Sequence, residues 1–112
     1  MSTIGKIEGE RMAALACVNR VLLRAAELDW ESSALGKLEQ IKDRLDGVSP
    51  CARRGEIALR GALTTLRSAT SRLNAVADVM KTSADFSTRM PGLLSKATTV
   101  AGQVAKLRNG RH

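Results

Sequence analysis

Apolar side chains recur every three or four positions along nearly the whole chain, in four successive registers. Residues three, four and seven positions apart share one side of an α-helix. The pattern therefore predicts an all-α protein in which each helix carries one apolar stripe. In chain order, the stripes comprise Ile4, Ile7, Ala14, Val18, Val21, Ala25 and Leu28; Ala34, Leu38, Ile41, Leu45 and Val48; Leu59, Leu63, Leu66, Leu73, Ala77, Met80 and Ala84; and Leu93, Ala97, Val100, Val104 and Leu107.

Breaks in this pattern predict four helices, roughly over residues 3–28, 32–46, 50–88 and 92–108. The register slips near Trp30, which indicates a kink or a tight break after the first segment. Gly47 suits a helix end, and Pro50 suits the first position of the helix that follows. We expect that helix to continue until Pro91 interrupts it.

A short connection between the second and third segments predicts that residues 2–47 and 50–88 are antiparallel neighbours. They would form a long, coiled-coil-like helical hairpin. The additional C-terminal helix either folds back across this hairpin or projects toward another subunit. Because 112 residues with 44% hydrophobic side chains suffice for one modest core, we expect a single helical domain over residues 1–112. Its architecture would be a three- to four-helix bundle or an oligomer.

The composition suggests that partner helices cover part of the apolar surface. Trp30 and Phe86 are the two aromatic residues, so Leu, Val, Ile, Met and Ala must build the core. Alanine buries little area per residue, which favours long paired helices over a globule with a ligand pocket. We therefore predict that the last two stripes pack against a partner chain. The predicted partner-packing residues are Leu59, Leu63, Leu66, Leu73, Met80, Leu93, Val100, Val104 and Leu107.

The side of the third helix opposite its apolar stripe carries small, uncharged residues where solvated helices usually carry Glu and Lys. Such a band either provides a second surface for close helix packing or is a tolerant exposed face. The fourth segment repeats the trait at Ser95, Thr98, Thr99 and Gly102. The band on the third segment comprises Ile57, Gly61, Thr64, Thr65, Ser68, Ser71, Ala75, Val79 and Thr82.

The net charge of +7 comes from the second half of the chain. Residues 1–48 hold seven basic and eight acidic side chains, whereas residues 49–112 hold eleven basic and three acidic ones. This asymmetry suggests an anionic partner such as nucleic acid, a membrane surface or an acidic protein. The candidate anion-binding residues are Arg53, Arg60, Arg67, Lys81, Arg89, Lys96, Lys106, Arg108 and Arg111.

Three of these cations, Arg53, Arg60 and Arg67, are spaced by seven residues and so share one line along the helix, which Lys81 continues. The row either meets phosphates or carboxylates, or flanks the apolar stripe as coiled-coil e and g positions do. No aromatic stacking platform, zinc-finger spacing or basic zipper accompanies it. Nucleic acid binding would therefore act through the backbone alone and depend strongly on salt.

The sequence lacks the residue patterns of common catalytic sites. The single histidine, His112, is the last residue, and the two cysteines are 34 residues apart. No zinc-site spacing, Gly-rich phosphate loop or nucleophile with a nearby base is present. We therefore expect no enzyme, no catalytic residue, no metal, no cofactor and no small-molecule substrate. Cys17 suits the core, whereas Cys51, at a helix N-terminus beside Arg53, is a possible reactive thiol.

These observations favour a non-catalytic assembly or adaptor subunit that acts by helix packing, in a homo-oligomer or a larger complex. The alternative is a basic protein that binds nucleic acid or another polyanion through its C-terminal half. A membrane-surface helix over residues 92–108 is a weaker third hypothesis. No stretch is apolar enough to span a bilayer. Without a secretory signal, the chain is expected in the cytoplasm, with leaderless export left open.

Overall fold

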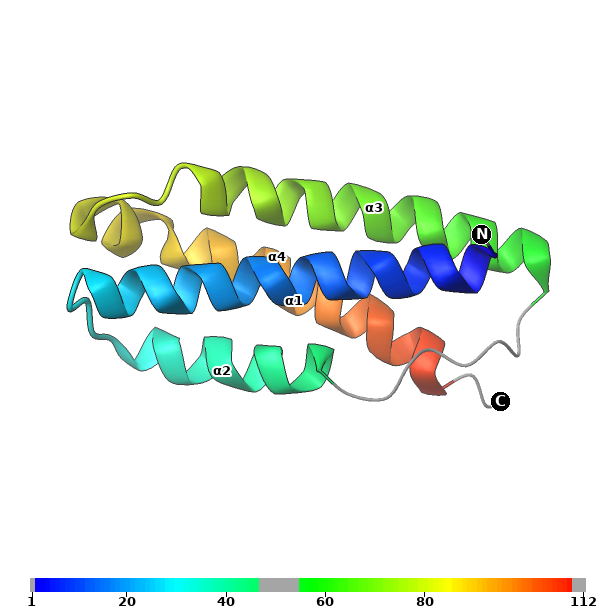
Figure 1. Ribbon diagram of the computed structural model, residues 1–112, viewed down its shortest axis with the longest axis horizontal. Coiled ribbons are helices and arrows are strands. Elements are labelled where there is room, and N and C mark those ends of the chain that lie inside the picture. Colours follow the sequence, from blue (N-terminus) through cyan, green and yellow to red (C-terminus); the bar gives the residue numbers. More distant parts are fainter. Residues whose placement is uncertain (1, 47–54, 110–112) are drawn as a thin grey trace.

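Four α-helices make up 88% of the part of the chain that the structure, a computed structural model, describes: residues 2–46 and 55–109. No strand occurs in these residues, which confirms the predicted all-helical fold. The helices pack into a rod with extents of 45 × 21 × 20 Å (Figure 1). They are α1 (Thr3–Glu27), α2 (Ser33–Leu45), α3 (Glu56–Asp78) and α4 (Ser83–Asn109).

The link between α1 and α2 is a tight break at the predicted register slip. Asp29 takes the left-handed conformation, with φ of 51°, and the Trp30 N–H donates to the Ala25 carbonyl at 2.9 Å. This pattern is a Schellman motif, which satisfies carbonyls at the end of a helix. The Ser32 hydroxyl then accepts from the Ala34 N–H at 3.2 Å and caps α2. The chain thus reverses within five residues.

The break between α3 and α4 differs from the prediction, which placed one helix over residues 50–88 and a break at Pro91. Instead, α3 ends at Asp78 and α4 begins at Ser83. Thr82 and Asp85 form a reciprocal cap: the Asp85 N–H donates to the Thr82 hydroxyl at 3.1 Å, and the Thr82 N–H donates to the Asp85 carboxylate at 3.0 Å. This cap starts a new helix, although the apolar spacing continues through Ala77 and Met80 up to the break; beyond it Phe86 is buried, and Ala84, which the spacing predicted for the stripe, is exposed.

Pro91 lies inside α4 and does not end it. Proline removes one backbone donor, to the Ser87 carbonyl, and destabilises a helix interior by about 3 kcal/mol. Met90 and Leu93 on either side are buried, so the core contacts of α4 continue across the proline. Burial of these side chains offsets the local cost.

Helices that follow each other along the chain run in opposite directions (Figure 1). In space the four helices occupy the corners of a square in the order α1, α2, α4, α3. α1 packs against α2 and α3, α4 packs against the same two helices, and α2 and α3 do not contact each other within the described residues. Consequently α1 and α3 are parallel neighbours, and the long antiparallel hairpin of residues 2–47 against 50–88 is not formed. The antiparallel pairs are α1 with α2 and α3 with α4. The predicted break at Gly47 and Pro50 lies outside the described residues.

The core runs along the centre of the square and takes side chains from all four helices. Phe86 and Leu66 are fully buried, and the ring centroids of Trp30 and Phe86 lie 5.4 Å apart. The Trp30 indole N–H also donates to the Ser87 hydroxyl at 3.1 Å, which holds the α1–α2 turn against α4. Arg11 is the one buried charged side chain in the described residues: it pairs with Glu8 and donates to the Leu45 carbonyl at the end of α2.

Candidate functional site

The predicted partner-packing residues are buried inside this single chain. All nine side chains are at most 6% exposed, because they lie in the core that the four helices share. The structure therefore differs from the predicted arrangement, in which these stripes face a partner chain: the apolar stripes of α3 and α4 are buried within the bundle. The nine buried residues are Leu59, Leu63, Leu66, Leu73, Met80, Leu93, Val100, Val104 and Leu107. Candidate contacts must therefore lie on the outer surface.

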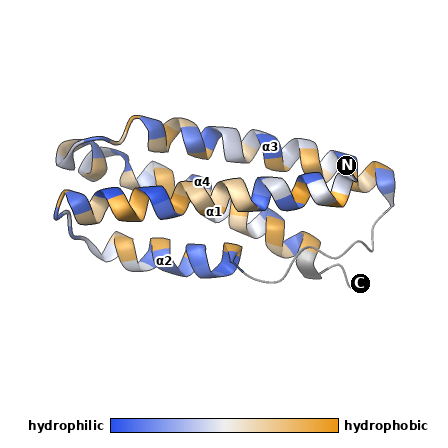
Figure 2. Cartoon of the chain, viewed as in Figure 1, coloured by the Kyte–Doolittle hydropathy of each residue, from blue (hydrophilic) through white to orange (hydrophobic). Residues whose placement is uncertain are grey.

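The uncharged band of α3 lies on that outer surface. Ile57 is 88% exposed, and a Cβ added at Gly61 would meet no atom within 4 Å. The exposed side of α4 continues it with Ala84, Thr88, Ser95, Thr98 and Thr99. Figure 2 shows pale, intermediate colours along the middle of α3 and blue, hydrophilic segments on α2. We call this surface of α3 and α4 the uncharged face; on α3 it comprises Ile57, Gly61, Thr64, Thr65, Ser68, Ser71, Ala75 and Val79.

A hollow of about 210 Å³ opens between α3 and α4 beside the uncharged face, lined by Ala69, Arg72, Ser95, Lys96 and Thr99. Arg72 and Lys96 make no hydrogen bond or ion pair with any described residue, and no carboxylate lines the hollow. Lys96 was among the predicted anion-binding residues, whereas Arg72 was missed. Arg72 could have been recognised as a candidate anion-binding residue from its position four residues after Ser68, at the edge of the uncharged band. We call this feature the basic hollow.

The predicted arginine row is engaged in ion pairs. Arg60 Nε lies 3.3 Å from Glu56 Oε1 on the same helix, and Arg67 Nε lies 3.8 Å from Glu10 Oε2 on α1. The hydrogen bond from the Thr3 hydroxyl, assisted by Arg60, lowers the pKa of the Glu56 carboxyl. Both arginines therefore flank the α1–α3 contact and already have acidic neighbours. Arg53, the first member of the row, lies outside the described residues.

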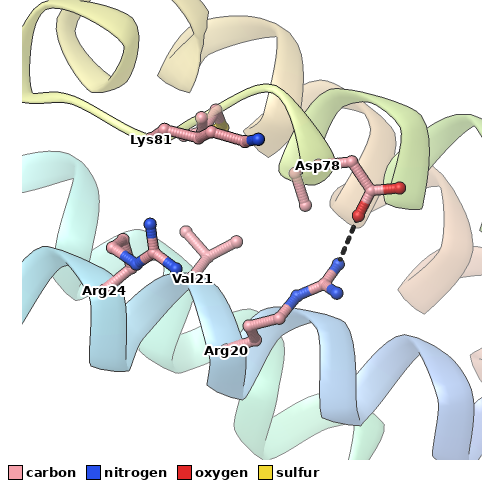
Figure 3. A pocket seen from close by; sticks show the side chains of 7 residues that line it. Arg20, Val21, Arg24, Asp78 and Lys81 are labelled. Atoms are coloured by element: carbon pink, nitrogen blue, oxygen red, sulfur yellow. Dashed lines mark hydrogen bonds and ion pairs between the residues drawn. The ribbon is translucent and has the colours of Figure 1, made fainter.

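Further cations gather where α1 and α3 end together (Figure 3). Arg20 Nη2 lies 3.0 Å from Asp78 Oδ1, and Arg24 Nε lies 3.8 Å from Glu27 Oε1. These two arginines and Lys81 line a hollow of about 110 Å³ over Val21. Since the Arg20 and Asp78 side chains are more than half exposed, the pair contributes little to stability.

An acidic hollow lies between α1 and α2, the helix pair that does not form the basic hollow. Its volume is about 350 Å³, and it combines three carboxylates with an apolar floor and no cation. Asp29, Glu31 and Glu39 make no ion pair with any described residue. The sequence analysis assigned Trp30 to the break alone and did not identify this hollow. We call it the acidic hollow; it is lined by Leu22, Ala25, Ala26, Asp29, Trp30, Glu31, Leu35 and Glu39.

The other candidate residues are not brought into one site. Arg89 and Lys106 are exposed at different levels of α4. The side chain of Arg108, together with Arg111 and the possible reactive thiol of Cys51, lies outside what the structure describes. Cys17 is buried, and burial raises the pKa of its thiol, as expected of a core cysteine.

Among the described residues, no group of three His, Cys, Asp or Glu side chains is placed to hold a metal ion. No described helix is long and apolar enough to cross a membrane. Comparison of the chain with protein-family models, with curated proteins and with solved structures finds no match.

Proposed function

We propose that this protein is a non-catalytic helical assembly subunit that packs the uncharged face of α3 and α4 against a helix of another chain. The observation that carries the proposal is the composition of that face. From Gly61 to Val79, charges border the outward centre of α3 but do not occupy it, and the side chains there are small. Small side chains let a second helix approach closely, and uncharged ones are desolvated at low cost.

The buried core supports a rigid surface of this kind. Because the apolar stripes are covered within the chain, the bundle does not need a partner to hide them. The exposed apolar side chains, chiefly Ile57 and Leu23, are then available for contacts with another molecule. Binding through a preformed helical surface involves little loss of conformational entropy.

Sedimentation equilibrium from micromolar to millimolar concentration tests this proposal. We expect the mass to rise with concentration for the wild type, and the variant Ser68→Arg with Ala75→Arg to remain monomeric, because two long cations obstruct close packing. Gln40→Arg on the exposed side of α2 is the control and should associate as the wild type does. Association that is unchanged in the double variant contradicts a role for the uncharged face.

Polyanion binding is the second candidate, supported by the two cations of the basic hollow, which pair with none of the described residues, and by the excess of basic residues in the second half of the chain. It would act through backbone phosphates and weaken as salt rises. A fluorescence titration with single-stranded DNA of random sequence tests it. If affinity is unchanged by charge reversal at Arg72 and Lys96, this candidate fails.

A further inference from the structure

The acidic and basic hollows lie on opposite sides of the bundle. Helices α1 and α2 form one side of the square and α3 and α4 form the other (Figure 1). The residues that line the acidic hollow come from the α1–α2 side, and those that line the basic hollow come from α3 and α4. Their charges cannot meet within one molecule. Two copies, however, can bring them together.

The charged groups of the two hollows are complementary in sign. The acidic hollow presents Glu31 and Glu39 around Trp30, and the basic hollow presents Arg72 and Lys96. None of these four charged side chains has an ion pair or hydrogen bond with a described residue. Opposite charges on two surfaces steer their encounter and fix the register in which they dock.

The surroundings of the hollows are also complementary in size. The outer surface of α1 exposes large apolar groups, with Leu23 67% and Met12 51% exposed. The α3–α4 side exposes Ser, Thr and Gly residues of the uncharged face. Large side chains on one surface and small ones on the other allow two helix pairs to interdigitate.

We propose that the occupant of the basic hollow is a second copy of this chain, which docks through its acidic hollow. Glu31 and Glu39 of one copy would pair with Arg72 and Lys96 of the next. This inference rests on the proposed function and names its partner. Because the two surfaces differ and lie on different helix pairs, the contact is head-to-tail and continues from copy to copy as an open chain unless the rotation closes it into a ring.

Two neutral variants test the contact by complementation. Glu31→Gln with Glu39→Gln removes the acidic surface, and Arg72→Gln with Lys96→Gln removes the basic one. Each variant alone should associate roughly tenfold more weakly than the wild type, since two exposed ion pairs are lost. Mixed together, each supplies the surface that the other lacks, so light scattering should show a 1:1 complex that does not grow further. Its formation also shows that both variants are folded.

The matched control is Lys81→Gln with Arg89→Gln, which removes the same charge from exposed positions outside both hollows. It should associate as the wild type does, and wild-type association should weaken as salt rises. A mixture that stays monomeric, or neutral variants that associate as strongly as the wild type, would overturn this head-to-tail contact. If the Ser68→Arg and Ala75→Arg substitutions still prevent association in that case, the proposed role of the uncharged face stands, and a surface other than the acidic hollow docks on it. A wild type that is monomeric at every concentration rejects docking between copies. In that case, loss of single-stranded DNA binding in the Arg72→Gln, Lys96→Gln variant would assign the basic hollow to a polyanion instead.

Discussion

The exposed side of the α1–α2 pair carries charges of both signs, whereas that of the α3–α4 pair is mostly Ser, Thr, Gly and Ala bordered by cations. Inside, the two pairs follow one rule, since each helix contributes an apolar stripe at helical spacing to a shared core. The difference is therefore confined to the surface and the turns. The apolar pattern is thus common to the two pairs, and the proposed partner contacts depend on the outward residues, in which the pairs differ.

The largest expected effect tests whether the two pairs share one core. Leu66→Ala should reduce the free energy of unfolding by about 2–5 kcal/mol, because Leu66 is fully buried within the monomer. Urea denaturation of dilute, monomeric protein measures this. The control, Leu23→Ala on the exposed side of α1, should change stability by no more than about 0.5 kcal/mol. If Leu66→Ala left the free energy of unfolding of the monomer unchanged, Leu66 would be better explained as a residue that packs against a partner chain.

Arg11 distinguishes the first pair, because it joins α1 to the end of α2 from a buried position. Arg11→Met should destabilise the protein by about 1–3 kcal/mol, since the Leu45 carbonyl loses a charged donor. Chemical denaturation is again the measurement. Arg24→Met removes an exposed pair with Glu27 instead and should cost less than about 1 kcal/mol. Equal losses in the two variants would show that the Arg11 contact is unimportant.

The turn of the second pair depends on the reciprocal cap of Thr82 and Asp85. Thr82→Ala should destabilise the protein by about 1 kcal/mol, because the Asp85 N–H loses its acceptor. Thr88→Ala, at an exposed position of the same helix, is the control and should change stability little. Thermal unfolding of both variants provides the comparison.

The same cap adds a pH dependence. Hydrogen bonds from the Lys81 and Thr82 N–H groups hold the pKa of the Asp85 carboxyl below its ordinary value. A carboxyl whose pKa is lower in the folded state contributes stability that is complete above the unfolded pKa of about 3.9. This contribution is lost as the pH falls through the lower folded pKa. Asp85→Asn should flatten the stability profile in that acidic range, and an unchanged slope would exclude Asp85 as its source.

The smallest expected change in stability concerns Asp29 in the turn between α1 and α2. Asp29 has a positive φ, which glycine adopts without steric cost. Asp29→Gly should therefore stabilise the protein by about 0.5–1 kcal/mol, whereas Asp29→Val should destabilise it. Melting temperatures of the two variants should move in opposite directions. A shift of both in the same direction would argue against the left-handed turn.

The sequence predicted the helical class and the break near Trp30, because the register slip there is visible in the apolar positions. It misled at α3 and α4, since Leu73, Ala77 and Met80 maintain their spacing up to the break. Thr82 and Asp85, three residues apart, fit a capping pattern that the sequence analysis did not use; it placed the break at Pro91 instead. Helix order in space was not predictable, because an apolar stripe does not reveal which helix covers it.

The candidate surfaces show a similar limit. The uncharged face could be read from helical spacing, and its exposure in the structure agrees with that reading. Arg72 and the acidic hollow could not be identified, because their significance depends on the absence of neighbouring counter-charges from helices distant in sequence. The pair of Arg67 with Glu10 could not be predicted either, because it joins helices distant in sequence, whereas the pair of Arg60 with Glu56 follows from their spacing of four residues on one helix.

The position of α2 has a consequence for local opening of the bundle. This helix is the shortest of the four described, with 13 residues, and it buries three side chains, Leu38, Ile41 and Leu45, against α1 and α4. Segments with few buried apolar contacts detach at a lower free energy than the molecule as a whole unfolds. Backbone amides of α2 are therefore expected to exchange with deuterium sooner than those of α1, through a sub-global fluctuation in which the other three helices stay together.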